Sequence, residues 1–301
     1  MNSEDENRSQ EPKRIKPWRL PEYLEGQEKG IPTCLERYNL EFQAFTDLGE
    51  LFDKLAEAWR PQGRSLSEQE RLRLIFLYCV KQQMYGAVFM LLRLRIVDAL
   101  SITRYAIEAT ALAHHLWKKP ELFDIYIQAY PNINDHGSPS QWKLSPKYRD
   151  MFNAGELFGS LKKSLPSLAQ RLSNAYAIVC YRASHAGPGI ILNLKSREGK
   201  IFYHANELDE TKVDQCWAIL LVYYFDMLEV FYAILRQYIT TENQNALEQD
   251  FSRWRDKVLP RLAQEAKNRQ DGNQSEGATT GNQYRGQEMK IGPSTFLMHG
   301  A

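Results

Sequence analysis

VDALSITRYAIEATALAHHLWK, from Val97 to Lys118, is the stretch of sequence that decides the fold. Its apolar residues fall on every side of a helical wheel, and Pro120 follows two positions after its end. The residue before a proline disfavours the α conformation, so we expect the helix to stop there. Because a helix that is apolar all round normally lies at the centre of a protein, the segment predicts an all-α bundle built around it.

Helical spacing extends outward from this segment over most of the chain. Apolar residues recur every three or four positions from Cys34 to Arg60, and Ser67 with Glu70 forms a capping box that predicts a helix start. Gly86 and the segment 93–95 are candidate breaks in the helix that follows. Further helices are expected over 121–130, from Pro166 to Tyr181, from 209 or 211 to 239, and over 242–266, where Pro260 is expected to bend or end the last one.

One segment is predicted not to be helical. Two short apolar runs, 190–194 and 201–203, flank the turn sequence Ser196-Arg197-Glu198-Gly199. This pattern is typical of a small β-hairpin, which we place at about 189–204. The expected organisation is a flexible polar and basic arm over 1–30, a single helical domain over 31–266 and a disordered tail over 267–301.

Composition excludes several classes of function. The chain has 301 residues, 43% hydrophobic, and its 38 Lys and Arg nearly balance its 37 Asp and Glu, for a formal net charge of +1. Generic coating of nucleic acid through a broad basic face is therefore not expected, although a local basic cleft remains open. The four cysteines are far apart and form no C-x-x-C pair, so we expect reduced, structural thiols.

Location and cofactors are predicted from what the sequence lacks. The first residues are acidic and polar, and no apolar run approaches the ~20 residues needed to span a bilayer, so we expect a cytoplasmic protein with no membrane contact. The sequence contains no zinc-binding or di-iron helix motif, no phosphate-binding loop and no dinucleotide-binding turn. We therefore expect no metal ion and no cofactor.

The first polar constellation lies within the central helix. Arg104 and Glu108 are four residues apart and share a face, and His115 lies about 20° from Arg104 on the helical wheel. We expect this stripe to face the bundle interior or a subunit interface. Because an unpaired buried charge is costly, either the pair fixes the register of the helix, or Arg104 contacts an anion that Glu108 helps to orient.

The second constellation is Tyr181-Arg182-Ala183-Ser184-His185, directly before Gly187-Pro188. Arg182 and His185 are three residues apart at a helix end and can converge. A histidine can act as general base near neutral pH, and an arginine can stabilise the charge that develops on a phosphate under attack by a ribose 2′-hydroxyl. The alternative is structural, because a helix C-terminus favours cationic side chains.

These two motifs, Arg104-x-x-x-Glu108-Ala109 and Tyr181-Arg182-Ala183-Ser184-His185-Ala186-Gly187, resemble those of a HEPN-like group of prokaryotic helical proteins over about residues 40–240. The resemblance implies a helical bundle, often dimeric, in toxin–antitoxin or phage-defence systems. It also implies a metal-independent ribonuclease in which His185 is base or acid, Arg182 binds the scissile phosphate, and Arg104 with Glu108 organises the site. RNA and an antitoxin or other protein are the implied partners.

The chain also departs from that family pattern. Arg182 and His185 have two residues between them, whereas catalytic members of the superfamily have four to six between the equivalent arginine and histidine. A degenerate member that binds RNA without cleaving it is therefore a second interpretation. The third is a non-enzymatic homodimeric helical module, in which the polar stripe serves only as an interface.

Overall fold

Helices make up almost all of the chain that the computed structural model describes, which comprises residues 20–59, 65–129, 150–184 and 210–277. The all-α prediction is confirmed, and within these ranges there is no β-strand. The β-hairpin predicted at about 189–204 lies outside the described residues. The first half contains α1 (Leu20–Arg37), α2 (Asn39–Trp59), α3 (Glu68–Leu92), α4 (Ile96–Lys118), η1 (Pro120–Leu122) and α5 (Phe123–Ala129). The second half contains α7 (Ala154–Ser164), α8 (Pro166–Val179), η3 (Cys180–Ser184), α10 (Glu210–Leu235), η5 (Arg236–Tyr238), α11 (Thr241–Arg253), η6 (Trp254–Val258) and α12 (Leu259–Gly277).

Local signals set where several helices begin and end. The capping box at the start of α3 is present, since the backbone N–H of Glu70 donates to Ser67 Oγ and the N–H of Ser67 donates to Glu70 Oε2. Pro166 occupies the first position of α8, where its missing N–H costs nothing. The predicted break at 93–95 is confirmed, with Leu94 in the left-handed region at φ 59°. The break considered at Gly86 is wrong, because α3 runs straight through it.

Two predicted helices are divided in the structure. The helix expected over 34–60 is split at Tyr38, where α1 ends and α2 begins. The last helix is interrupted by η6, a wider π-helical turn, directly before Pro260. A proline removes one backbone donor and crowds the carbonyl four residues earlier, which here belongs to Asp256. The π turn relieves this conflict, so the rod continues as α12 instead of ending.

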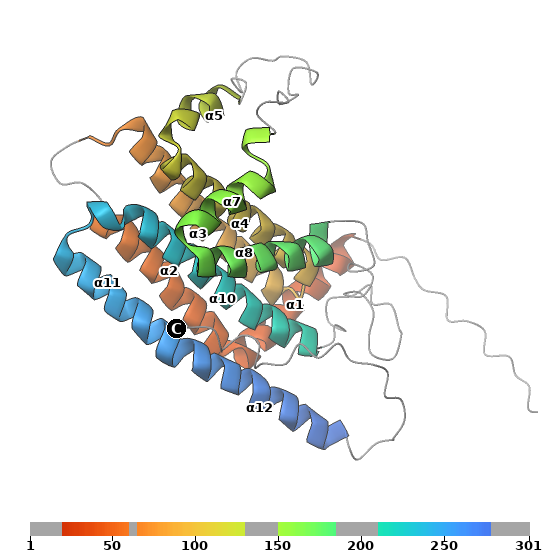
Figure 1. Ribbon diagram of the computed structural model, residues 1–301. Coiled ribbons are helices and arrows are strands. Elements are labelled where there is room, and N and C mark those ends of the chain that lie inside the picture. The colour runs from red at the N-terminus through yellow and green to blue at the C-terminus, as the bar shows by residue number, and fades with distance from the viewer. Residues whose placement is uncertain (1–19, 60–64, 130–149, 185–209, 278–301) are drawn as a thin grey trace, which may run out of the picture.

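The core of the bundle is organised around α10, which packs against α2, α3, α4, α8 and α12. Trp217, Tyr224 and Phe231 of α10 are completely buried. α4 is the second central helix and contacts α3, α7, α8, η3 and α10. Figure 1 shows α11 and α12 as one long rod along one side of the bundle, beside α2 and α10. The prediction that residues 97–118 form a central helix therefore agrees with the packing.

The helical region is longer at both ends than the predicted domain of residues 31–266. α1 begins at Leu20, inside the segment expected to be a flexible arm, and α12 extends to Gly277, inside the segment expected to be a disordered tail. Tertiary contacts explain both extensions. Arg93, directly after α3, pairs with Glu28 of α1 at 2.6 Å, and Arg269 of α12 contacts two buried carboxylates.

Among the residues that the structure describes, two helices are long and apolar enough to cross a membrane by length and composition, namely α3 and the segment Val213–Tyr238. Neither helix is an uninterrupted apolar run, because Lys81 lies within α3, and Asp226 and Glu229 lie within Val213–Tyr238. The apolar character has another explanation in the second case, because 72% of the most apolar window of Val213–Tyr238 is buried inside the bundle. The corresponding fraction for α3 is only 39%, so much of its apolar surface is not used by the described part of the chain.

Candidate functional site

The ion pair predicted within the central helix is present on α4. Arg104 Nε donates to Glu108 Oε1 at 2.9 Å, one helical turn away. The side chains are 28% and 33% exposed, so the pair does not lie in the interior of the bundle. Both groups lie at the edge of the bundle, where they remain partly accessible to solvent. In this position the pair costs little to desolvate and stays available to a ligand.

Tyr176 of α8 completes this cluster. Its hydroxyl donates to the same Glu108 Oε1 at 2.9 Å, and the Arg104 guanidinium carbon lies 5.9 Å from the centre of its ring. Burial, together with the neighbouring Glu108, raises the pKa of Tyr176 to about 12, so the phenol stays protonated and remains a donor. Glu108 is thus held by two donors from two helices, which fixes its position relative to α8.

The end of α8 continues into the second predicted constellation. The π-helical turn η3 carries Cys180, Tyr181 and Arg182, and it packs directly on α4. Arg182 is partly buried, and its positive charge acts on Cys216 and Tyr223 of α10, where it opposes the rise in pKa that burial causes in both groups. The charge of Arg182 thus lies within electrostatic range of α10, and Tyr176 contacts the Arg104–Glu108 pair.

His185 lies outside the described residues, so the geometry of the proposed His185–Arg182 pair is not established here. The structure brings Arg104 and Glu108 together with the helix end that carries Arg182, across α4, α8 and η3. Residues of α4 and of α8 with η3, about 70 positions apart in sequence, thus lie side by side.

His115, the third polar residue of the predicted stripe, is not part of this cluster. It is completely buried near the other end of α4, with its ring packed edge-on against Phe152 at 6.0 Å. Neither ring nitrogen of His115 has a hydrogen-bond partner within the described residues, and burial lowers its pKa. Eleven residues of helix separate it from Arg104 by about 16 Å. His115 is a neutral core residue.

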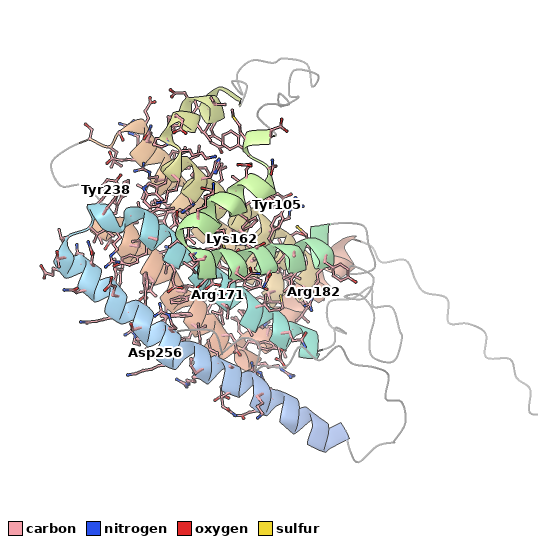
Figure 2. All side chains as sticks on the ribbon, in the orientation of Figure 1. Tyr105, Lys162, Arg171, Arg182, Tyr238 and Asp256 are labelled. Atoms are coloured by element: carbon pink, nitrogen blue, oxygen red, sulfur yellow. The ribbon has the colours of Figure 1, made fainter. Side chains whose placement is uncertain are left out.

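Two exposed tyrosines lie next in sequence to the arginines of the two motifs and were not singled out by the sequence. Tyr105 of α4 and Tyr181 of η3 are each 58% exposed, next in sequence to Arg104 and Arg182 respectively. Figure 2 labels Tyr105 of α4 and Arg182 of η3. An exposed aromatic ring beside an arginine is a surface on which an unpaired base can stack. The sequence pattern of apolar and polar residues could not reveal these exposed rings, because the pattern does not tell which tyrosine faces solvent.

Buried acidic clusters join other helices, and sequence reasoning missed these too. Arg171 of α8, labelled in Figure 2, donates to both carboxylate oxygens of Asp226 on α10 at 3.0 Å. Burial raises the pKa of Asp226 to about 6, although Arg171 opposes the shift. Elsewhere on α10, Arg269 of α12 contacts Asp214, and it also contacts Glu41 of α2. Both clusters hold helices together through contacts separate from the Arg104–Glu108 pair.

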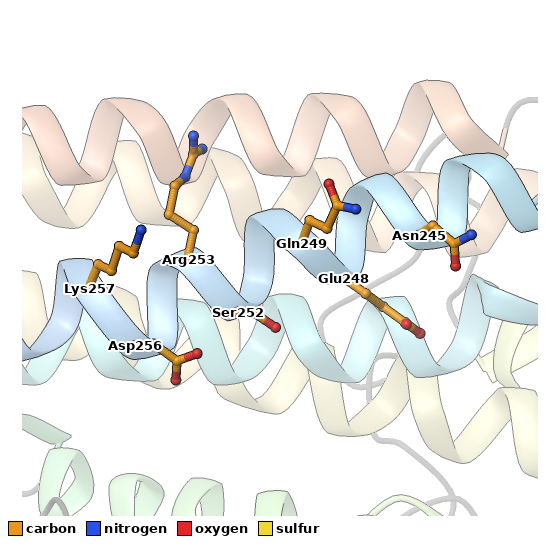
Figure 3. Close-up of a pocket in the computed structure, with 7 residues that line it drawn as sticks. All are labelled: Asn245, Glu248, Gln249, Ser252, Arg253, Asp256 and Lys257. Atoms are coloured by element: carbon orange, nitrogen blue, oxygen red, sulfur yellow. The ribbon is translucent and has the colours of Figure 1, made fainter.

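A separate hollow lies on the surface of the α11–η6 rod (Figure 3). Its volume is about 560 Å³, and it is wide open to solvent. The residues that line it belong to one helical face and include two acids and two bases: Asn245, Glu248, Gln249, Ser252, Arg253, Asp256 and Lys257. These charges balance, so we assign the hollow no ligand. Within the described residues, no group of three or more His, Cys, Asp or Glu side chains could hold a metal ion.

Comparison of the chain with protein-family models, with curated proteins and with solved structures finds no match. The fold and the site together define an all-α helical bundle with a half-exposed arginine–glutamate–tyrosine cluster at the contact between α4 and the end of α8.

Proposed function

We propose that this protein is an RNA-directed, HEPN-like helical protein that cleaves RNA without a metal ion. The observation that carries the proposal is the hydrogen bond from Tyr176 to Glu108. It ties the Arg104–Glu108 pair of α4 to the helix end that carries Arg182 and leads into His185. The described part of the second motif, Tyr181 to Ser184, packs on the helix that carries the first motif.

The chemistry of this site follows from the charges of its groups. A ribose 2′-hydroxyl attacks the adjacent phosphorus while a base, here assigned to His185, removes its proton. The bond from phosphorus to the 5′-oxygen breaks, which leaves a 2′,3′-cyclic phosphate and a 5′-hydroxyl that takes its proton from water or from an acid in the site. The phosphate gains negative charge in the transition state, which Arg182 stabilises. Arg104 is fixed by Glu108 and acts as a second cationic contact for the RNA backbone, while Tyr176 positions Glu108. The exposed tyrosines beside the two arginines supply rings for unpaired bases next to the cleaved bond.

The decisive experiment is incubation of the purified full chain with total RNA in the presence of a chelator. We expect His185→Ala to slow cleavage by about 100-fold or more, in the range found when a general base is removed. Arg182→Ala should also slow cleavage strongly. The matched control is Arg261→Ala, which removes one exposed arginine from α12, a helix that takes no part in the site. It should cleave as fast as the wild-type protein.

Other outcomes separate the alternatives. Equal cleavage by the wild-type protein and His185→Ala would contradict the assignment of His185. Tight RNA binding without any cleavage would identify a binding module, which the departure in Arg–His spacing favours. Absence of both binding and cleavage would reject the RNA proposal and leave the non-enzymatic interaction module.

A further inference from the structure

A buried acidic cluster lies under the end of α12, where the α1–α2 junction meets the first turns of α10. Its acids are Glu41 of α2 and Asp214 of α10, whose side chains are almost completely buried. The buried ring of Tyr38 lies beside them. Arg269 of α12 reaches into this cluster and contacts both carboxylates. Tyr38, Glu41 and Asp214 are here called the α12 socket.

The contacts of Arg269 show which kind of cation the α12 socket suits. Nε donates to Asp214 Oδ1 at 3.3 Å, and Nη2 donates to Glu41 Oε1. The guanidinium carbon lies 5.2 Å from the centre of the Tyr38 ring. A guanidinium spreads its donors over a rigid planar fork, whereas the ammonium group of a lysine holds all its donors on one nitrogen. The socket therefore favours a guanidinium over an ammonium group.

Arg269 does not satisfy the whole of the α12 socket. Glu41 Oε2 and Asp214 Oδ2 are buried and accept no hydrogen bond within the described residues. A buried acceptor normally has a partner, and leaving it without one is costly, above all on a charged group. A guanidinium that approaches a carboxylate along its symmetric direction can pair with both of its oxygens. The two unpartnered oxygens therefore indicate a cation that fits the socket better than the one α12 supplies.

The charges around the α12 socket fit a single monovalent cation. Burial raises the pKa of Asp214, and Tyr38, Arg269 and Arg37 oppose that rise. The socket and its surroundings thus hold two acids, Glu41 and Asp214, and two arginines, so their ionised charges balance. Without Arg269 one negative charge stays uncompensated in a buried place, and one guanidinium neutralises it. A divalent metal ion fits less well, because the described residues offer it no third carboxylate, histidine or cysteine.

Apart from Arg269, the end of α12 has little to hold it. Leu262 is the one residue of α12 among the buried hydrophobic residues of the described chain. The two turns between Leu262 and Arg269, residues 263–268, contain no buried side chain. Figure 1 shows α12 along the outside of the bundle. A helix held mainly by one buried side chain can be replaced by another helix without disturbing the hydrophobic core.

We propose that the α12 socket binds an arginine side chain of a partner protein, carried on a helix that takes the place of the end of α12. In the chain alone, Arg269 occupies the socket as an intramolecular ligand. The partner's arginine pairs with both oxygens of a carboxylate and so makes hydrogen bonds that Arg269 leaves unmade. A helix is the fitting carrier, because this side of α10 already accommodates one. The socket is separate from the Arg104–Glu108 cluster, so its occupation does not depend on RNA.

The first measurement asks whether the empty socket takes a free guanidinium group. Thermal unfolding of the full-length Arg269→Ala chain is followed in ethylguanidinium and, as the matched control, in ethylammonium at the same ionic strength. Ethylguanidinium should raise the unfolding temperature by about 3 °C at ten times its dissociation constant, and ethylammonium should not. Arg261→Ala keeps Arg269 in the socket and should respond to neither cation. Equal responses of Arg269→Ala to the two cations would overturn the proposal.

The second measurement tests exchange with α12. A fluorescent peptide with the sequence of Leu259–Gly277 serves as the arginine-bearing helix, and fluorescence anisotropy reports its binding to the full chain. It should bind Arg269→Ala about 10-fold or more tightly than it binds the wild-type protein, where α12 competes for the same place. The same peptide with Arg269→Lys should bind about 10-fold or more weakly, because the ammonium group cannot bridge the two carboxylates. A peptide with Arg261→Lys is the matched control and should bind like the unchanged one.

The outcomes of this measurement separate an exchangeable site from a fixed ion pair. Equal binding of the arginine and lysine peptides would overturn the proposal, because the socket would then not select a guanidinium. Binding to Arg269→Ala with none to the wild-type protein would overturn it as well, since α12 would then be a permanent occupant. If circular dichroism shows Arg269→Ala to be unfolded, Arg269→Lys takes its place, because it keeps the buried charge paired while it vacates the fork. The same differences between peptides are expected with that variant.

Discussion

Single side chains decide whether the α4–η3 contact is a binding surface. Tyr105 and Tyr181 expose their rings beside Arg104 and Arg182, although tyrosine usually buries most of its ring. An exposed ring offers a face to any base, and this kind of stacking is tolerant of sequence. In the proposed RNA site the two tyrosines would contribute to affinity, whereas the proposed chemistry would depend on His185 and Arg182.

Replacing these rings gives the first prediction. Tyr105→Ala and Tyr181→Ala should each weaken binding of single-stranded RNA by about 5- to 100-fold, since stacking is worth about 1–3 kcal/mol per base. Filter binding or fluorescence anisotropy measures the change. Tyr238→Ala removes an exposed tyrosine of η5 and is the matched control. Equal affinity in all three variants would show that the rings beside the arginines do not contact RNA.

The second prediction concerns a buried histidine. His114 is completely buried, neither ring nitrogen has a partner within the described residues, and burial with the nearby charge of Lys118 lowers its pKa to about 4. As the pH falls, the unfolded chain binds a proton at this residue near its usual pKa of 6.5, before the folded protein does. The contribution of neutral His114 to the free energy of unfolding is therefore fully present above about pH 6.5. This contribution is lost as the pH falls toward 4, which lowers the free energy of unfolding by up to about 3 kcal/mol.

His114→Phe should remove this loss. Urea unfolding of the variant and of the wild-type protein, each at neutral pH and at about pH 5, measures how much the free energy of unfolding changes between the two pH values. Asp226 acts in the opposite direction, because burial raises its pKa to about 6, and the folded state gains stability from it as the pH falls through that value. The two proteins share Asp226, so the difference between their pH slopes isolates His114. Identical slopes would contradict the prediction.

At the scale of elements, the question is what holds the C-terminal rod to the bundle. α12 contributes only Leu262 to the buried hydrophobic residues of the described chain. Arg269 compensates by contacting Glu41 of α2 and Asp214 of α10, whose side chains are 3% and 1% exposed. Burial raises the pKa of Asp214, and Arg269 opposes that shift. The docking of α12 is thus largely electrostatic.

The third prediction is that Arg269→Ala releases α12. It leaves two buried carboxylates without their cation, and breaking a buried pair from one side costs about 3–5 kcal/mol. Hydrogen exchange should show faster exchange of the backbone amides of α12, with α10 less affected. Arg261→Ala removes an exposed arginine from the same helix and should change neither exchange nor stability. If the two variants behave alike, Arg269 does not anchor the helix.

For the whole molecule, α10 couples all the layers of the bundle. Trp217 of this helix is completely buried, with its ring 5.6 Å from those of both Tyr38 and Phe45. The indole N–H of Trp217 has no hydrogen-bond partner within the described residues, so this side chain stabilises the fold through packing. A side chain of α10 that touches the α1–α2 junction and α2 at once makes the unfolding of these helices cooperative.

The fourth prediction separates packing from polarity at this position. Trp217→Ala should lower the free energy of unfolding by about 3–5 kcal/mol because it opens a large cavity. Trp217→Phe should cost clearly less, since no hydrogen bond is lost. Urea unfolding measures both, and helix content and aromatic signals should change at the same urea concentration if the bundle is one cooperative unit. Two separate transitions would show that it is not.

The sequence by itself determined the helical class and many helix limits. Ser67 caps α3 through Glu70, three residues away, and Pro166 begins α8 by its own fixed backbone. Such signals act within one helical turn, so they can be recognised from the spacing of residues in the sequence. The same pattern placed Arg104 and Glu108 on one face of α4, where the two side chains pair.

Only the tertiary structure decided which groups meet. Glu108 accepts a hydrogen bond from Tyr176, which is 68 residues away in sequence. Asp226 accepts one from Arg171, 55 residues away, and Glu41 accepts one from Arg269, 228 residues away. The tertiary structure also left the Arg104–Glu108 pair partly exposed. It left Ile75, Tyr78, Tyr85 and Phe89 of α3 exposed as well. The physical reason is that these outcomes depend on the crossing and rotation of whole helices, which are set by the sum of many small packing contacts and by no single residue spacing.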